Sequence, residues 1–143
     1  MVKGETIITI NASVEKVFAY VNEPTNLPGI WPSMVEVKDV QRLPNGGTSF
    51  RWVYKMAGVR FEGTTKDTEY VPNQRVVSKS TGGIESLFTW TFQPQDGGTK
   101  VTVEVEYTVP IPLLGKVAEV LIVKQNEREL ELVLANLKAK MEA

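Results

Sequence analysis

The sequence predicts an α+β domain in which one antiparallel sheet of seven strands packs against helices. Apolar and polar residues alternate, as they do in strands, over most of residues 34–109. Apolar residues recur at helical spacing just after a first short strand and again beyond Pro112. The expected order is one strand, two helices, six strands and a long helix. Helices that are segregated from an antiparallel sheet are typical of the α+β class.

The first segments are justified by residue type and by capping. Residues 6–10 are short and rich in β-branched residues, which favours a strand. Asn11 and Ser13 offer side-chain oxygens to cap a helix over the stretch VEKVFAYVN. Three prolines between residues 24 and 32 limit the next stretch to a short second helix.

Six strands follow, and turn signals separate them. MVEVKDVQRL leads to a turn at PNGG, and TSFRWVYKM leads to a two-residue turn at Ala57-Gly58. VRFEGTTKDTEYV ends at VPNQ, and RVVSKST is expected to connect through a three-residue TGG loop to the next strand. The last two strands lie on either side of QDGG, within IESLFTWTFQPQDGGTKVTVEVEYTV.

The expected registers determine which side chains face inward. Pairing across QDGG places Phe92 opposite Val101 and Ser86 opposite Tyr107, and nearly every outward pair is then polar. A two-residue turn at Ala57-Gly58 places Trp52 opposite Gly63, where the large ring finds room. In the strand RVVSKST we expect Val76, Ser78 and Ser80 to face inward, because the other phase would bury Lys79.

The inner face combines aromatic rings with hydroxyl groups, which is typical of a small-molecule pocket. A core built for stability alone would hold more Leu, Ile and Val. Packing remains the other interpretation, since aromatic residues of strands are packing residues more often than ligand contacts, and hydroxyls also bond to the backbone or to a buried water. The candidate ligand-binding residues on this face are Trp52, Tyr54, Phe61, Thr65, Ser78, Ser86, Phe88, Trp90, Val103, Val105 and Tyr107.

The C-terminal helix is expected from about Leu113 to Glu142, roughly 28 residues or about 40 Å. Its second half carries one apolar stripe: Leu130, Val133, Leu134, Leu137 and Met141. The first half is apolar on several faces and is expected to cover more than one surface, so Val120 and Val123 are further candidate ligand-binding residues. Asn126 and Glu127 either place polar groups at the inner end of a cavity or lie at the edge of the stripe and reach water.

Composition excludes several classes of protein. Seventeen acidic and sixteen basic residues give a net charge of −1, which does not favour nucleic-acid binding. The absence of cysteine and histidine excludes disulfides, thiolate sites and Ser/His triads, and the acidic residues show no ligand spacing. We therefore predict no catalytic residue, metal or cofactor. The 143 residues, 42% hydrophobic and 23% charged, are expected to form one domain over 1–143.

Two further expectations concern location and assembly. Unbroken apolar runs such as Val120 to Val123 are far shorter than the ~20 residues that span a bilayer. The N-terminus lacks a signal-peptide pattern, so we expect a soluble, cytoplasmic protein without a transmembrane segment. Nothing in the sequence indicates a homodimer.

The order of elements and several short motifs resemble the START-related, polyketide cyclase/dehydrase-like superfamily (SRPBCC), which includes the birch pollen allergen. The matching stretches are ITINASVEKVFAYVNEPTNLPGIWP, EYVP, TGG, WTFQPQDGGTKVTVEVEY and NLKAKME. The resemblance implies the helix-grip fold, in which a curved sheet grips the long helix around a cavity for lipids, sterols, polyketides or quinones. It also adds Trp31 to the candidate ligand-binding residues, since this segment often contributes to the cavity entrance in relatives.

Three functional hypotheses remain open. The first is the binding or transport of a small hydrophobic or amphiphilic molecule, and this molecule would be the partner. The second is an enzyme of the cyclase or dehydratase type, which needs an ionisable group inside the pocket. The third is a protein–protein module with a filled core and an outer apolar patch around Ile111, Pro112, Leu114 and Val117.

Overall fold

The computed structural model describes residues 1–110 and 116–143. Its elements follow the predicted order of one strand, two helices, six strands and a long helix. They are β1 (Val2–Ile10), α1 (Val14–Val21), the 3-10 helix η1 (Pro24–Gly29), β2 (Met34–Arg42), β3 (Thr48–Met56), β4 (Val59–Val71), β5 (Arg75–Gly82), β6 (Ser86–Gln95), β7 (Gly98–Tyr107) and α2 (Lys116–Glu142).

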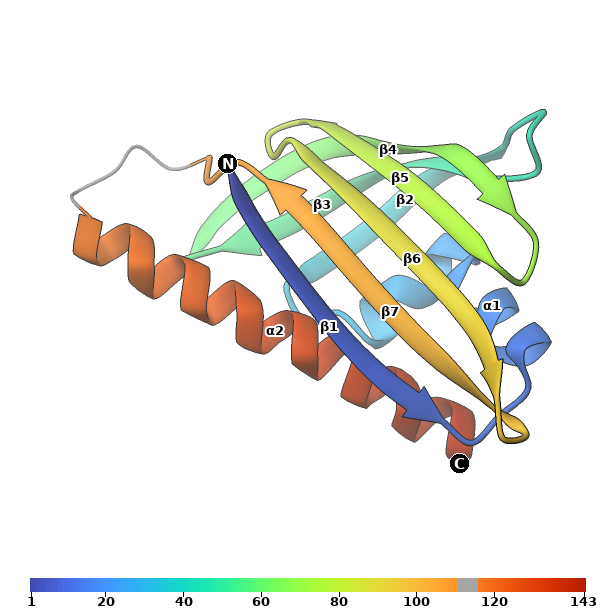
Figure 1. Cartoon of the computed structure of the whole chain (residues 1–143). Coiled ribbons are helices and arrows are strands. Elements are labelled where there is room, and N and C mark those ends of the chain that lie inside the picture. The colour runs from blue at the N-terminus through green and yellow to red at the C-terminus, as the bar shows by residue number, and fades with distance from the viewer. Residues whose placement is uncertain (111–115) are drawn as a thin grey trace.

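The seven strands form one antiparallel sheet in the order β1-β7-β6-β5-β4-β3-β2. The sheet curves, and α2 runs along its concave side, while α1 and η1 lie near one end of the sheet (Figure 1). This arrangement confirms the predicted α+β helix-grip fold. β1 and β2 are the two edges, and the C-terminal end of α2 lies beside the end of β1 (Figure 1).

The predicted strand registers are confirmed. Phe92 pairs with Val101 across the β6–β7 turn, and Trp52 pairs with Gly63 across the β3–β4 turn. The phase of β5 is also correct, since Ser80 is buried and Lys79 is exposed. The predicted TGG loop is displaced by two residues. β5 continues through Gly82, whose φ of +105° few other residues adopt, so residues 83–85 form the connection.

The first helix begins where its capping residue predicts. The Ser13 hydroxyl accepts a hydrogen bond from the backbone N–H of Lys16 at 3.3 Å, in the manner of an N-cap. Val17, Phe18 and Val21 form the buried face of α1. The edge of the Phe18 ring meets the ring of Phe92 on β6 at a centroid distance of 5.1 Å, so α1 closes one end of the sheet with aromatic packing.

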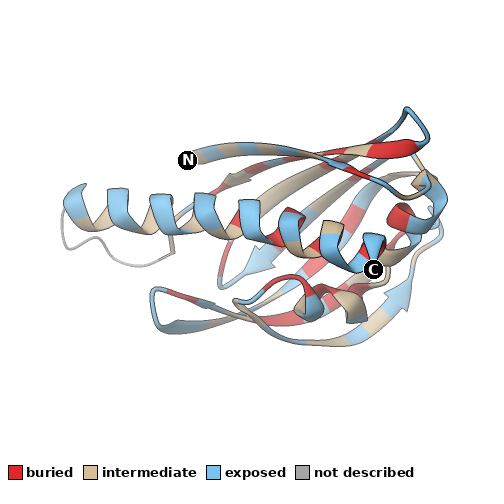
Figure 2. Cartoon of the chain, turned by 90° about the horizontal axis from the view of Figure 1, so that it is seen from below, coloured by how far each residue is buried: buried red, intermediate tan, exposed pale blue. Residues whose placement is uncertain are grey.

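The two halves of α2 differ in burial (Figure 2). The predicted stripe is confirmed, since all five of its residues are buried. In the first half Val117, Val120 and Leu121 are 76%, 51% and 58% exposed, so these residues do not cover a second surface as expected. The reason is geometric, because the first turns of α2 extend past the sheet edge and only the later turns lie against it (Figure 2). The predicted helical residues 113–115 lie outside the described residues.

The packed part of the core lies where α1 and the second half of α2 meet the sheet. Ile10, Val17, Val101, Val133 and Leu137 are each fully buried there. Dense packing at this end means that any hollow between sheet and helix must lie toward the first half of α2. Within residues 1–110 and 116–143, none of the helices is both long enough and apolar enough to cross a bilayer.

Candidate functional site

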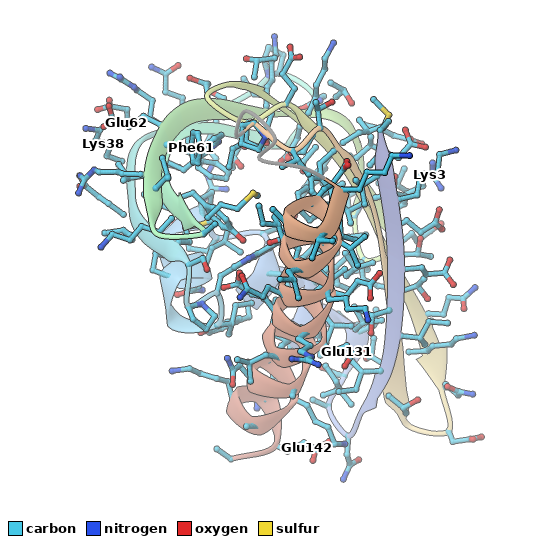
Figure 3. All side chains as sticks on the ribbon, turned by 90° about the vertical axis from the view of Figure 1, so that its left-hand side faces the viewer. Lys3, Lys38, Phe61, Glu62, Glu131 and Glu142 are labelled. Carbon is cyan, nitrogen blue, oxygen red and sulfur yellow. The ribbon has the colours of Figure 1, made fainter. Side chains whose placement is uncertain are left out.

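A cavity of about 430 Å³ lies between the concave face of the sheet and α2. The cavity walls come from all seven strands, although β2 contributes only its first residue. The last residue of α1, η1 with its flanking residues, and the middle of α2 complete them. Figure 3 shows the sheet curving around the helix. Phe61 of β4 lies on the inner side of the sheet, whereas Lys38 of β2 and Glu62 of β4 lie on its outer side. Ten of the predicted ligand-binding residues line this cavity: Trp31, Trp52, Tyr54, Thr65, Ser78, Ser86, Phe88, Trp90, Val105 and Tyr107.

The other four predicted residues lie elsewhere. Phe61 is half-buried and packs against the core, and Val103 is fully buried, opposite Trp90 on β6. Val120 is exposed and Val123 half-buried on the first half of α2. For the helix residues the cause is the same as above, because this half of α2 is largely exposed to solvent. Contact between any of the fourteen residues and a ligand stays a prediction.

A row of hydroxyl groups crosses the inner face of the sheet. Thr65 on β4 pairs with Ser80 on β5, Ser80 pairs with Ser86 on β6, and Ser86 pairs with Tyr107 on β7. All four residues line the cavity. The hydroxyls of Thr65 and Ser80 are 2.6 Å apart and form a hydrogen bond. Neighbouring strands are ~4.8 Å apart, so the row offers polar groups at regular intervals along an otherwise apolar wall.

Asp67, a site residue that the sequence analysis did not select, continues this polar wall. It lines the cavity and is 5% exposed. One carboxylate oxygen accepts hydrogen bonds from the backbone N–H and the hydroxyl of Thr48, at 2.8 and 3.3 Å. The other accepts from the Ser78 hydroxyl at 2.7 Å. The sequence did contain a signal for Asp67. It follows Thr65 by two residues in the same strand, so the two side chains must lie on the same face of the sheet.

Tyr54 is the centre of a second polar group, which links β3 and the segment between η1 and β2 to α2. Its hydroxyl donates to the carboxylate of Glu129 at 3.0 Å and accepts from the indole N–H of Trp31 at 3.1 Å. Ser33 donates to the same carboxylate through its backbone N–H and its hydroxyl, at 2.8 and 2.7 Å. Burial raises the pKa of Tyr54 well above its ordinary value, and the Glu129 charge adds to this shift. Tyr54 is therefore a protonated donor near neutral pH.

Tyr107 and Asn126 provide a third polar contact on the cavity wall. The side-chain amide of Asn126 donates to the Tyr107 hydroxyl at 3.0 Å. Burial is the main cause of a raised pKa for Tyr107, so this hydroxyl also stays protonated at neutral pH. Of the two alternatives left open for Asn126 and Glu127, the structure favours a different one for each residue: Asn126 is half-buried in the cavity wall, whereas Glu127 also lines the cavity but is exposed and reaches water.

The exposed residues that line the cavity show where it reaches the surface. They are Lys3 and Glu5 on β1, and Glu127 and Glu131 on α2. The opening therefore lies between the β1 edge and the middle of α2. Trp31, which the resemblance assigned to the entrance segment, is 7% exposed and belongs to the inner wall. Over the described ranges, three or more acidic side chains do not gather as a metal ligand set would require.

A comparison with protein-family models gives one match, over residues 1–142, to the family described as polyketide cyclase / dehydrase and lipid transport. The chain belongs to this family. No curated protein matches the chain.

Solved structures agree on the fold at low sequence identity. A START superfamily protein from Mycobacterium smegmatis superposes with a TM-score of 0.81 at 16% identity, covering 98% of this chain and 97% of that chain. The Zhui aromatase/cyclase from a Streptomyces species gives 0.79 at 14% identity, covering 99% and 93%. A protein from Thermus thermophilus gives 0.76 at 24% identity, covering 98% and 97%. At these identities the similarity shows the fold alone.

Proposed function

We propose that the protein binds or transports a small hydrophobic or amphiphilic molecule in the cavity between the sheet and α2. The observation that carries this proposal is the hollow itself. Interiors of folded proteins are normally close-packed, whereas this hollow of about 430 Å³ opens between β1 and α2 and is walled mostly by apolar side chains, so an apolar molecule that displaces its water is bound favourably. This volume lies within the ~300–1,000 Å³ range of small-molecule sites.

The chemistry of the walls supports an apolar ligand with a few polar atoms. Phe88 and Trp90 provide apolar surface, and the edge of the Trp31 ring meets Phe88 at a centroid distance of 5.3 Å. The hydroxyl row and Asp67 provide hydrogen-bonding groups at fixed positions. A mostly apolar wall with a few convergent polar groups is the pattern of sites that bind lipid-like, quinone-like or polyketide-like molecules. We propose that the ten lining residues named above contact the ligand.

An enzyme of the cyclase or dehydratase type acting on a polyketide-like substrate is the alternative. The cavity wall holds the carboxylates of Asp67 and Glu129, so the ionisable groups that such an enzyme needs are present. Both carboxylates already accept several hydrogen bonds from the protein, and both tyrosines are protonated donors, which favours positioning over proton transfer. Turnover of a poly-ketone substrate that Asp67→Asn abolishes would establish the enzyme instead.

The protein–protein module is not supported, because that hypothesis required a filled core and the core holds a cavity. Three residues of its expected outer patch, Ile111, Pro112 and Leu114, lie outside the described residues, and the fourth, Val117, is exposed. A cytoplasmic location remains a prediction, which cell fractionation would test.

Native mass spectrometry of gently purified protein, with an organic extract analysed beside it, tests the proposal. We expect an added mass that denaturation releases and that is recovered as an apolar compound. Ser86→Leu places a larger side chain in the cavity and should reduce this occupancy. Thr89→Leu makes a comparable change on the outer face of β6 and should not. A bare wild-type chain that gains no thermal stability from lipids, quinones and polyketides would refute the proposal.

A further inference from the structure

Among the fully buried polar atoms of the described side chains, one in the cavity wall has no hydrogen-bond partner. The indole Nε1 of Trp52 is buried, and it makes no hydrogen bond to any of the described residues. The whole residue is only 5% exposed, and it lines the cavity. A buried N–H without an acceptor is destabilising, and native proteins rarely leave one unpaired. By contrast, the indole N–H of Trp31 in the same wall donates to the Tyr54 hydroxyl at 3.1 Å.

The residue opposite Trp52 determines where this N–H lies. Trp52 pairs with Gly63, and a Cβ added to Gly63 would lie 2.3 Å from Cζ2 and 2.7 Å from Cη2 of the indole. The six-membered ring therefore rests against the β4 backbone at Gly63. Nε1 is two bonds from Cζ2, so it is held beside the same strand. Because Gly63 has no side chain, this position provides no side-chain acceptor for the N–H.

A second unused donor lies nearby. Thr65 is two residues from Gly63 on the same face of β4, about 7 Å along the strand. Its hydroxyl and that of Ser80 form one hydrogen bond with each other. Two hydroxyls carry two protons, and this bond uses only one of them. No other hydrogen bond to either hydroxyl occurs among the described residues, so the O–H of one of these two cavity-lining residues is left without a protein acceptor there.

The charges around the cavity decide what kind of acceptor fits. Asp67 is buried in the wall, two residues after Thr65 in β4, and carries a carboxylate. Glu129 on α2 adds a second carboxylate. The rim contains Glu5, Glu127 and Glu131 against the single cation of Lys3. An anionic ligand such as a carboxylate would be repelled by the Asp67 carboxylate, which is buried where the dielectric is low, and much less by the exposed carboxylates of the rim, which water and salt screen. The two unused donors therefore fit a ligand whose hydrogen-bond acceptor is an uncharged oxygen atom.

We propose that Trp52 is a specificity-determining residue, whose Nε1–H donates a hydrogen bond to a neutral carbonyl oxygen of the bound molecule. The inference rests on the proposed function, because it assumes that the cavity holds a ligand. It narrows that ligand from apolar molecules in general to neutral carbonyl compounds. Plain hydrocarbons leave Nε1 unpaired, and fatty acids present a carboxylate to Asp67.

Three rigid probes of similar size test this inference: fluorene, 9-fluorenone and fluorene-9-carboxylate. We expect wild-type protein to bind 9-fluorenone about fivefold more tightly than fluorene in isothermal titration calorimetry, which is the effect of one typical net hydrogen bond. Fluorene-9-carboxylate should bind more weakly than fluorene. Trp52→Phe keeps an aromatic ring without the N–H donor, and it should bind fluorene and 9-fluorenone with equal affinity.

The indole ¹H–¹⁵N signal of Trp52 provides a readout that does not depend on a variant. It should move downfield when 9-fluorenone binds and not when fluorene binds. If Trp52→Phe does not fold, this measurement on wild-type protein decides alone. Equal affinities with an unmoved signal would mean that water satisfies Nε1, which overturns the inference and leaves the proposed function in place. Binding of neither probe also overturns the inference, and the organic extract then decides the proposed function independently. Tight binding of the carboxylate overturns the requirement for a neutral acceptor.

Discussion

A single methyl group at Gly63 should disturb the cavity wall. A Cβ at this position would lie 2.3 Å from Cζ2 of Trp52 and 2.5 Å from the carbonyl oxygen of Thr81. The indole is buried and the carbonyl belongs to the backbone of β5, so neither is free to move away. Overpacking of this kind costs ~1–3 kcal/mol, while replacing glycine by alanine recovers about 0.4–1 kcal/mol through the unfolded chain. We expect Gly63→Ala to lower the free energy of unfolding by about 1–2 kcal/mol.

Urea unfolding followed by far-ultraviolet circular dichroism measures this loss as a lower midpoint at an unchanged slope. Gly4→Ala is the matched control, since Gly4 also lies in a strand that lines the cavity and its nearest contact is Val105 Cγ1 at 3.4 Å. That variant should stay within about 0.5 kcal/mol of wild type. Our account of the wall is wrong if Gly63→Ala is as stable as wild type, or if both variants lose the same amount.

Three further predictions concern stability. Leu137→Ala, at a fully buried position on α2, should lower the free energy of unfolding by ~2–5 kcal/mol in the same urea assay, and a loss below ~1 kcal/mol would contradict the packed end of the core. Asp67→Asn should cost ~1–3 kcal/mol, because an amide replaces one of the oxygens that Thr48 and Ser78 donate to; an unchanged midpoint would show that these bonds contribute nothing. The raised pKa of Tyr54 means that folding favours its neutral form, so this stabilisation is complete below pH ~10, where unfolded tyrosine ionises, and is lost as pH rises further. The urea midpoint of the wild-type protein should therefore fall between pH ~9 and ~11, and the midpoint of Tyr54→Phe should fall less. If both midpoints fall equally with pH, Tyr54 is not the group responsible.

Local patterns in the sequence were sufficient to predict the order of the elements and the pairing of β3 with β4 and of β6 with β7, but not the full length of β1 or the loop between β5 and β6. The QDGG turn and the alternation on either side of it determine the β6–β7 register, because a slip by one residue would turn every apolar side chain outward. The Ala57-Gly58 turn places Trp52 against Gly63 in the same way. The buried stripe of α2 follows from helical spacing alone. Ten of the fourteen predicted site residues line the cavity because alternation determines which face a strand residue occupies.

Only the tertiary structure decided where the inner face is packed and where it is hollow. Phe92 and Trp90 lie on the same face of β6, but only Trp90 lines the cavity, because α1 covers the sheet at Phe92. The contact of Tyr54 with Glu129 joins residues 75 positions apart, and no periodicity predicts it. The exposure of Val120 likewise depends on how far α2 extends past the sheet. Alternation determines the side of a strand on which a residue lies, whereas the curvature of the sheet and the placement of the helix determine what that residue meets. Both of these depend on contacts between distant parts of the chain.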